Sequence, residues 1–297
     1  MTVIALDIGG TCIKYGLVDQ EGKEIASGLV ATETSNQGFL NQVFSIIDEM
    51  RQGRDDILGI GISLPGFVNP ATGENTDFTV WPCFIAFNLK EEVEKHTGLP
   101  VCVENDSNCA AIAEGKVGAA KGCDNYLMVT VGTGLGGAIV TGGKLMRGAH
   151  FKAGELGFLM LEKGRFPGAT SDLVRRVADY VKECKEGAGD KTQYSDETLV
   201  DGRFIFSHMS DSRVRDIYLS WLEELAITLG NVVSILDVDM LLIGGGISEE
   251  PVFINDLTDK IYDLFPLKEY TKIKACSLGN QAGKIGAAIL LKDKERM

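Results

Sequence analysis

The chain has 297 residues, of which 44% are hydrophobic and 24% are charged, so it is long enough for two packed α/β domains. Its formal net charge of −13 argues against a nucleic-acid partner, because phosphate backbones are bound by basic patches. No apolar stretch approaches the roughly 20 residues that span a bilayer, and the amino terminus lacks a signal pattern. We therefore expect a cytoplasmic protein without membrane partners, whose seven scattered cysteines stay reduced and mostly buried.

The first part of the chain alternates short strands and helices. Its opening reads as two strands joined by a Gly-Gly turn, which is typical of a β-meander. Later segments show helical spacing of apolar residues or short buried runs, separated by an irregular stretch over 69–87. In chain order we expect strands 3–6 and 13–18, a helix 38–50, a strand 57–64, a helix 90–96, a strand 101–103 and a helix containing 110–114.

The second part of the chain begins with a hairpin that resembles the one at the opening of the chain. The expected elements are strands 126–131 and 138–141, a helix 214–236, a strand 240–243 and a terminal helix 282–291. No low-complexity linker separates the two parts, so only this restart places a domain boundary near 116–124. The predicted domains are 1–117 and 118–281.

Asp7-Ile8-Gly9-Gly10-Thr11 is the first candidate site for an anionic nucleotide. An acidic residue ends a strand, and two glycines without Cβ atoms let backbone N–H groups approach an anion. Thr11 adds a hydroxyl donor. An ordinary hairpin that binds nothing is equally compatible with these five residues.

The second glycine-rich turn, Gly132-Thr133-Gly134-Leu135-Gly136-Gly137, formally matches the G-x-G-x-x-G pattern of dinucleotide-binding dehydrogenases. That pattern must open a helix, whereas residues 138–141 are β-prone and end at another glycine turn. A second phosphate-binding hairpin therefore fits better than a dehydrogenase. A glycine-rich turn without a ligand remains the alternative.

Glu104-Asn105-Asp106-Ser107-Asn108 follows a strand and precedes a helix, which places Asn105 and Asp106 at the carboxyl edge of a sheet. A carboxylate between two phosphate turns could accept the proton of a hydroxyl that attacks a phosphoryl group. The alternative is that Asp106 or Ser107 merely caps the helix. Further on, residues 241–248 form a buried strand ending in three glycines, which leave room for a flat ring or simply make a tight turn.

Six segments, taken in order, resemble the ROK family (repressor, open reading frame, kinase): 7–11, 65–68, 104–108, 132–137, 154–157 and 243–248. The resemblance covers nearly the whole chain. It implies an α/β fold of the actin-like ATPase type (hexokinase-type, ribonuclease H-like), with two domains around a cleft. It also implies that the terminal helix, 282–297, returns to the first domain.

The resemblance further implies the roles of individual residues. Asp106 is the catalytic base, Asn105 and Glu155 hold sugar hydroxyls, and Pro65 and Gly66 are expected at the substrate. Asp7 is expected to hold Mg²⁺ through water. ATP is expected at Asp7, Gly9, Gly10, Thr11, Gly132, Thr133, Gly134, Gly244, Gly245 and Gly246. The expected partners are a sugar or glucoside and ATP, in a homodimer.

Three function classes follow from the resemblance. A sugar kinase is favoured, because the phosphate turns occur together with a candidate base. A DNA-binding repressor is disfavoured, since such members carry a helix-turn-helix domain ahead of the phosphate motif and only six residues precede Asp7. A sugar sensor without catalysis is the third class.

The chain departs from the family pattern at Phe158. Many members have a histidine there and a cysteine cluster after it, which form a zinc site, but 159–172 contains neither residue type. The resemblance implies that the histidine reaches the anomeric end of the sugar, where phenylalanine cannot hydrogen-bond a free hydroxyl. We therefore expect a C1-substituted glucoside that is phosphorylated on its 6-hydroxyl and extends towards 78–87. Glucose and N-acetylmannosamine are the runner-up substrates. In the alternative, Phe158 is a core residue of a strand over 157–161.

Overall fold

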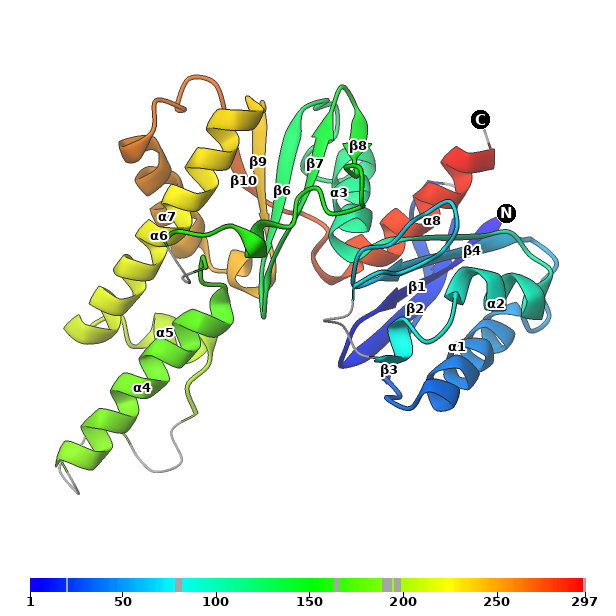
Figure 1. Cartoon of the computed structure of the whole chain (residues 1–297), viewed down its shortest axis with the longest axis horizontal. Coiled ribbons are helices and arrows are strands. Elements are labelled where there is room, and N and C mark those ends of the chain that lie inside the picture. Colours follow the sequence, from blue (N-terminus) through cyan, green and yellow to red (C-terminus); the bar gives the residue numbers. More distant parts are fainter. Residues whose placement is uncertain (20, 78–81, 163–165, 189–193, 195–198, 296–297) are drawn as a thin grey trace. The chain divides into compact units, whose positions relative to one another are not determined.

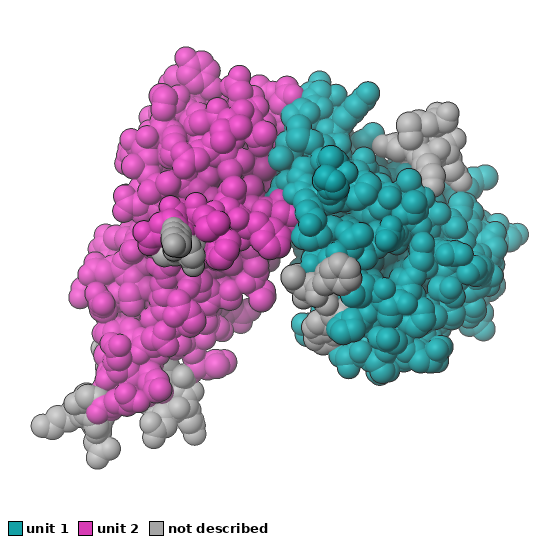
Figure 2. Space-filling view, in the orientation of Figure 1, with its two compact units in different colours: residues 1–124, 138–154, 277–297 teal, residues 125–137, 155–276 magenta. Residues whose placement is uncertain are grey.

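The structure is a computed structural model of the whole chain, and it describes residues 1–19, 21–77, 82–162, 166–188, 194 and 199–295. The chain forms two compact units (Figure 2). Unit 1 comprises Met1–Asp124, Ala138–Gly154 and Ser277–Met297, and unit 2 comprises Asn125–Gly137 and Glu155–Cys276. Each unit contains both strands and helices (Figure 1).

Unit 1 is built on a five-stranded sheet in the order β3-β2-β1-β4-β5. The first three strands form an antiparallel meander, and β4 and β5 continue the sheet in parallel. The strands expected in this part of the chain are confirmed, while β3 was not predicted. The strands are β1 (Thr2–Ile8), β2 (Cys12–Val18), β3 (Glu24–Ala31), β4 (Ile57–Leu64) and β5 (Val101–Asn105).

Helices cover both faces of this sheet, because β1 is apolar on both sides and successive side chains point to opposite faces. Ile4, Leu6 and Ile8 pack with the first two helices, whereas Val3 and Ala5 pack with the terminal helix. The predicted helices are therefore confirmed with somewhat longer bounds. They are α1 (Asn36–Arg51), α2 (Leu89–Thr97), α3 (Asp106–Val117) and α8 (Ala282–Glu295).

Helix α8 lies unusually close to its neighbours in unit 1. A Cβ on Gly286 would overlap the carbonyl oxygen of Cys109 in α3, and a Cβ on Gly61 in β4 would overlap the carbonyl of Ala287. Glycine is required at both places because the backbones themselves are in contact. The terminal helix α8 is therefore closely packed between α3 and the sheet of unit 1.

The segment that leads into α8 is fixed by one buried carboxylate. Glu114, which is fully buried near the end of α3, accepts hydrogen bonds from the backbone N–H groups of Ser277 and Leu278, each at 2.8 Å. It also accepts the N–H of Ala119 at 2.7 Å. A carboxylate that accepts several N–H groups is compensated for its loss of water. Glu114 thus anchors the distant segment at Ser277 and Leu278, and the residues that directly follow α3, to this helix.

Unit 2 contains the parallel strands β6, β9 and β10, and the second five-stranded sheet has the order β10-β9-β6-β7-β8. The expected strands over 126–131, 138–141 and 240–243 and the long helix are confirmed. The strands are β6 (Tyr126–Val131), β7 (Leu135–Thr141), β8 (Lys144–Met146), β9 (Met240–Gly244) and β10 (Lys272–Ala275). The helices are α4 (Thr170–Ala188), α5 (Gly202–Ser207), α6 (Ser212–Leu236) and α7 (Pro251–Leu264).

The 25-residue helix α6 has the length and hydropathy of a membrane span, yet 44% of its most apolar window is buried inside the protein. Trp221 is fully buried and its indole N–H donates to the carbonyl of Gly168 at 2.9 Å. Glu224 of the same helix forms an ion pair with Arg176 of α4. These contacts are those of a core helix.

We predict that Gly286→Ala lowers the free energy of unfolding by about 1 to 3 kcal/mol, because the new methyl group has no space against α3. Thermal unfolding measures the effect. Gly202→Ala is the matched control, since a Cβ at Gly202 meets no atom within 4 Å. Equal melting temperatures for the two variants would contradict the close packing of α8.

Candidate active site

The carboxylate of Asp7, just before the first glycine turn, is held in place by neighbouring side chains. Asp7 accepts a hydrogen bond from the Ser63 hydroxyl at 2.7 Å and is paired with the Lys14 ammonium at 3.3 Å. Gly283 permits this arrangement, because a Cβ there would lie 2.5 Å from a carboxylate oxygen of Asp7. The three elements β1, β4 and α8 therefore hold Asp7 in one orientation.

The turn itself leaves backbone donors available. Its ends are closed by hydrogen bonds from the Gly9 N–H to the Cys12 carbonyl and from the Thr32 hydroxyl to the Gly9 carbonyl. Within the described residues, the N–H groups of Gly10 and Thr11 make no hydrogen bond. Adjacent unpaired N–H groups in a turn are suited to bind an anion. Unit 1 thus offers an anion-binding turn beside Asp7.

The junction of β5 and α3 corrects the sequence interpretation of the helix cap. The cap residue is Asn105, whose side-chain oxygen accepts the N–H of Asn108 at 3.1 Å, rather than Asp106 or Ser107. The amide nitrogen of Asn105 donates to the Gly66 carbonyl at 3.0 Å. Asn105 therefore connects the predicted substrate segment around Pro65 and Gly66 to the start of α3.

Because Asn105 caps the helix, the carboxylate of Asp106 is not needed for that purpose. One of its oxygens accepts the N–H of Ser107 at 2.7 Å, and the side chain is exposed to solvent. The crowded protein surroundings nevertheless desolvate the carboxylate, and the charge of Asp7 adds to this effect, so that the pKa of Asp106 rises to about 6. A carboxylate with a raised pKa and an accessible oxygen is suited to accept a proton.

Glu104, the residue before the helix cap Asn105, is completely buried and takes part in a separate hydrogen-bond network. The Arg147 guanidinium bonds one of its oxygens at 2.7 Å, and the Asn108 amide bonds the other at 3.0 Å. Arg147 follows β8 and thereby connects that part of unit 1 to the end of β5. The side-chain oxygen of Asn108 is buried and is without a hydrogen-bond partner among the described residues.

Unit 2 contains a pocket of about 550 Å³ at the second glycine turn. Gly132 and Thr133 line it together with Gly246, and apolar side chains such as Phe206 and Ile247 form part of its wall. A hollow with apolar walls and a few polar groups is typical of a small-molecule site. Of the six residues predicted to bind ATP in the second part of the chain, three line this pocket and three do not.

These three glycines are Gly134, Gly244 and Gly245. Gly134 belongs to the turn and has open space around it. Gly244 ends β9 and lies against Cys276, and a Cβ on Gly245 would overlap the carbonyl of Val131 in β6. Gly245 also has a φ of 91°, which favours glycine. Of Gly244, Gly245 and Gly246, only Gly246 lines the pocket. Gly244 and Gly245 instead leave room for Cys276 and for the Val131 carbonyl.

The sequence analysis did not predict helix α4, whose amino end lies at the second glycine turn. The Ser171 hydroxyl donates to the Thr133 carbonyl at 2.6 Å, and the Thr170 hydroxyl donates to the Val131 carbonyl at 3.1 Å. The amino end of a helix favours anions through its unpaired N–H groups and its dipole. Thr170 and Ser171 could have been noticed as a helix start followed by Asp172.

Glu155 and Phe158 belong to a short 3₁₀ turn, Leu156–Phe158, with Glu155 at its start. The strand over 157–161 that we considered is absent, because the Phe158 N–H bonds the Glu155 carbonyl at 3.2 Å. The Phe158 side chain is 59% exposed. The alternative that Phe158 is a core residue is therefore wrong.

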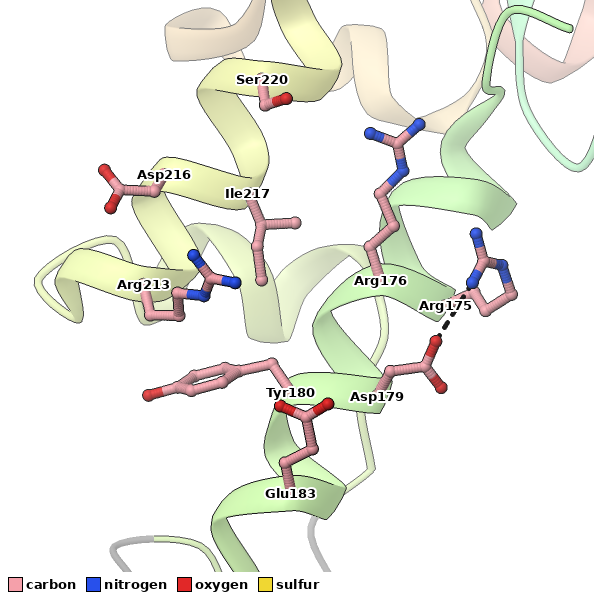
Figure 3. Close-up of a pocket in the computed structure, with 9 residues that line it drawn as sticks. All are labelled: Arg175, Arg176, Asp179, Tyr180, Glu183, Arg213, Asp216, Ile217 and Ser220. Atoms are coloured by element: carbon pink, nitrogen blue, oxygen red, sulfur yellow. Dashed lines mark hydrogen bonds and ion pairs between the residues drawn. The ribbon is translucent and has the colours of Figure 1, made fainter. Parts of the chain in front are cut away.

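A second hollow lies between α4 and α6, and none of the predicted site residues is among its lining residues (Figure 3). Its lining includes the arginines Arg175, Arg176 and Arg213 and the acidic residues Asp179, Glu183 and Asp216. The opposite charges balance, and Arg175 and Arg176 are already paired with acidic neighbours. This hollow has no feature that selects a ligand.

The site residues thus form two groups, each within its own unit. Unit 1 holds Asp7, the turn Gly9 to Thr11, Asn105 and Asp106 with the segment at Pro65 and Gly66. Unit 2 holds the pocket at the second glycine turn and, separately, Glu155 with Phe158. Phosphoryl transfer depends on groups that bind the phosphates and on a base or positioning residue at the attacking oxygen, and each unit contributes candidates for these roles.

Comparison with known proteins agrees with this geometry. The sequence model of the ROK family matches residues 3–294. The β-glucoside kinase of Listeria monocytogenes is 35% identical over 299 aligned residues, which cover 97% of this chain and 96% of that protein.

Two solved structures are also similar. A ROK family protein from Streptococcus pneumoniae in complex with sucrose has a TM-score of 0.83 at 28% identity, and the match covers 100% of this chain and 99% of the other. A ROK family glucokinase from Streptomyces griseus in complex with glucose and AMPPNP has a TM-score of 0.78 at 28% identity, covering 99% and 100%.

The fold and the two glycine turns define an actin-like ATPase of the hexokinase type, with the architecture of sugar kinases. The family match over nearly the whole chain then narrows the class. This protein belongs to the ROK family.

We predict that Arg147→Met lowers the free energy of unfolding by about 3 kcal/mol, because it leaves the buried carboxylate of Glu104 without its cation. Chemical denaturation measures the loss. Arg175→Met is the control, since the side chain of Arg175 is 63% exposed and its ion pairs lie at the surface. If the free energy of unfolding falls by the same small amount in both variants, the buried carboxylate of Glu104 does not need the charge of Arg147.

Proposed function

We propose that this protein transfers the γ-phosphoryl group of ATP to the 6-hydroxyl of a C1-substituted glucoside, with Asp106 as the base. An ATP-dependent sugar phosphotransferase is supported by the family match and by relatives that are sugar kinases. We also propose that the enzyme works in the cytoplasm as a homodimer with domains 1–117 and 118–281, and with 282–297 as part of the first.

One observation carries the catalytic proposal: Asp106 has an accessible carboxylate of raised pKa at the end of β5, while Asn105 caps the helix in its place. In the proposed reaction, Asp106 accepts the proton as the sugar hydroxyl attacks the γ-phosphorus atom, and ADP leaves with the electrons of the broken bond. The N–H groups of Gly10 and Thr11 would bind phosphate oxygens. Asn105, Glu155, Pro65 and Gly66 are proposed to orient the sugar.

The nucleotide is proposed to bind with its adenosine in the pocket of unit 2, at Gly132, Thr133 and Gly246. Mg²⁺ is proposed as the metal, and the residues fit a water-mediated contact. Asp7 already accepts hydrogen bonds on both of its oxygens, and Mg²⁺ retains most of its waters in phosphate sites. The ion would neutralise charge that develops on the transferred phosphoryl group.

The exposed ring of Phe158 supports the glucoside proposal. An aromatic ring that cannot hydrogen-bond leaves a free anomeric hydroxyl unpaired, whereas it can pack against a substituent on C1. The expected extension towards 78–87 falls partly on 78–81, which lie outside the described residues. Glucose or N-acetylmannosamine is the second candidate acceptor. A sugar sensor without catalysis is the remaining class, and assays of ADP release on a sugar panel separate it from a kinase.

We predict that Asp106→Asn lowers kcat by about 10² to 10⁴ while ADP still binds, because the amide retains the size of the side chain but cannot accept a proton. Coupled measurement of ADP release gives the rate, and calorimetry gives ADP affinity. Activity within a few-fold of the wild type would remove Asp106 from the role of base.

The pH profile gives an independent check of this role. The pKa of Asp106 is raised to about 6, so the ionised base predominates above that pH and kcat/KM should fall as the pH falls through it. The residual activity of Asp106→Asn should lack this acidic limb. An identical limb in both proteins would assign the titration to another group.

We predict that Phe158→Ala lowers kcat/KM for a β-glucoside such as cellobiose by about tenfold relative to glucose, which corresponds to about 1.4 kcal/mol. Tyr270→Ala, which removes an exposed ring elsewhere in unit 2, is the control and should leave the ratio unchanged. A wild-type preference of tenfold or more for a free monosaccharide would refute the glucoside proposal.

A further inference from the structure

We propose that Arg147 is a positioning residue for the sugar acceptor, which acts through the buried carboxylate of Glu104 on Asn105 and Asp106. Arg147 is not among the residues proposed to bind the sugar or the nucleotide, and no sequence motif singled it out. The inference rests on the proposed function, in which Asn105 is a sugar ligand and Asp106 is the base.

The carboxylate of Glu104 is bonded both to the junction of β5 and α3 and to Arg147. One oxygen, Oε1, accepts the backbone N–H of Asn105 and the side-chain N–H of Asn108, each at 3.0 Å. The other oxygen, Oε2, accepts the Nε–H of Arg147 at 2.7 Å. Because the Glu104 side chain is fully buried, these protein groups rather than water set the direction of its carboxylate. Arg147 therefore holds the group that in turn holds Asn105 and Asn108.

The same junction presents the proposed sugar ligand and the proposed base. The side-chain oxygen of Asn105 accepts the N–H of Asn108 at 3.1 Å, and the Asn105 amide donates to the Gly66 carbonyl at 3.0 Å. Asp106 lies between Asn105 and Asn108 in the chain, so its backbone is bounded by two residues that Glu104 binds. A misplacement of about 1 Å at the reacting groups can lower a rate about 100-fold, even when its cause lies far from the chemistry. A change in the direction of Glu104 therefore reaches the acceptor site through the backbone of 105–108.

Arg147 also begins a loop that closes on itself within unit 1. Its carbonyl accepts the N–H of Ala153 at 3.2 Å, so the two ends of the loop are bonded together. Between these ends, the Lys152 ammonium lies 4.5 Å from the ring centroid of Phe67, which follows Gly66 in the chain. The loop over 147–153 thus uses two basic side chains, and each contacts a residue next to a proposed sugar ligand. It is placed to fix both segments of unit 1 that are proposed to hold the sugar.

The chemistry of the guanidinium suits this position. The group is planar and its N–H bonds have fixed directions, so it binds a carboxylate oxygen in a defined orientation. The distance of 2.7 Å to Glu104 is at the short end of charge-assisted hydrogen bonds. The Arg147 side chain is 31% exposed, whereas that of Glu104 is fully buried. Arg147 thus gives the buried carboxylate both a counter-charge and a direction, and the direction is what positions the junction.

The test compares sugar binding, nucleotide binding and turnover in Arg147→Met. The sugar is whichever of cellobiose, glucose and N-acetylmannosamine the wild type binds most tightly by calorimetry. Arg147→Met should raise its Kd about fivefold or more and lower kcat about tenfold or more. The Kd of ADP should stay unchanged, because the hydrogen-bond partners of Glu104 lie outside the proposed nucleotide site. Arg54→Met, which removes an arginine paired with Asp56 in unit 1, is the control and should change none of these quantities.

Sugar affinity separates positioning from a mere loss of folded protein. Partial unfolding lowers kcat and the stoichiometry of ADP binding in proportion, but the folded molecules keep the same Kd for the sugar. A higher sugar Kd at full ADP stoichiometry is therefore the signature of displaced sugar ligands. Should Arg147→Met fail to fold, Arg147→Lys is the second variant. It keeps the charge but loses the planar head, so its sugar Kd should still rise about threefold or more.

A double variant separates the direction of Glu104 from its charge. Glu104→Gln combined with Arg147→Met removes both charges, so that no unpaired ion stays buried. If Arg147 served only as a counter-charge, this double variant should regain the wild-type Kd for the sugar. Positioning predicts a Kd still about fivefold weaker or more, because the glutamine side chain is no longer held from the loop over 147–153. Recovery of the wild-type affinity would overturn the inference.

The outcomes also distinguish this inference from the proposed function. If the wild type binds the sugar but releases no ADP, the kinase proposal is refuted, and the sugar Kd of Arg147→Met still decides the positioning role. If the wild type phosphorylates the sugar and Arg147→Met binds it with the same Kd, Arg147 is not a positioning residue, while the proposed function stands. If the wild type binds none of the three sugars, both are refuted.

Discussion

The carboxylates gathered at one end of the sheet in unit 1 impose the constraint on which the rest of the site depends. Asp7, Glu104 and Asp106 belong to or directly follow β1 and β5, whereas Glu114 lies near the far end of α3. A carboxylate removed from water must find compensation. Glu114 accepts backbone N–H groups, Glu104 has Arg147, and Asp7 has Ser63 and Lys14. Of these four residues Asp106 is the exposed one, and one of its carboxylate oxygens accepts the Ser107 N–H.

The glycines of this chain serve two different physical needs. Gly286 and Gly245 allow backbones to touch, and any side chain at these positions would overlap a carbonyl group. At Gly132 and Gly246, by contrast, a Cβ would meet no atom within 4 Å, and both residues line the pocket. For Gly245, Gly132 and Gly246 the sequence pattern does not separate the two uses, because each of them closely follows the end of a strand.

Phe158 illustrates how one substitution within a family pattern can be interpreted physically. A buried ring in a strand would have had no bearing on substrate choice, but the ring stands on a 3₁₀ turn and is exposed. Exposure of a large apolar side chain next to a proposed sugar ligand, Glu155, is what makes the glucoside hypothesis worth testing.

The sequence by itself determined the elements with strong local signals. The strands around Asp7 and those over 57–64 and 126–131 were predicted from short apolar runs bounded by turns, and the motif order indicated the family. Helix α4 was missed although Leu173, Val177 and Val181 recur at helical spacing, and β10 was missed because its four residues are only partly buried. A short strand such as β10 is defined by its pairing with β9, about which local periodicity carries no information.

Only the tertiary structure decided which side chain does what within these elements. That Asn105 rather than Asp106 caps α3 depends on the Gly66 carbonyl, which comes from another strand end. The pairing of Lys14 with Asp7 depends on the hairpin register, which fixes which residues stand opposite each other. A sequence names the residues that can donate or accept a hydrogen bond, but distance and direction select the partners, and both arise only when the chain has folded.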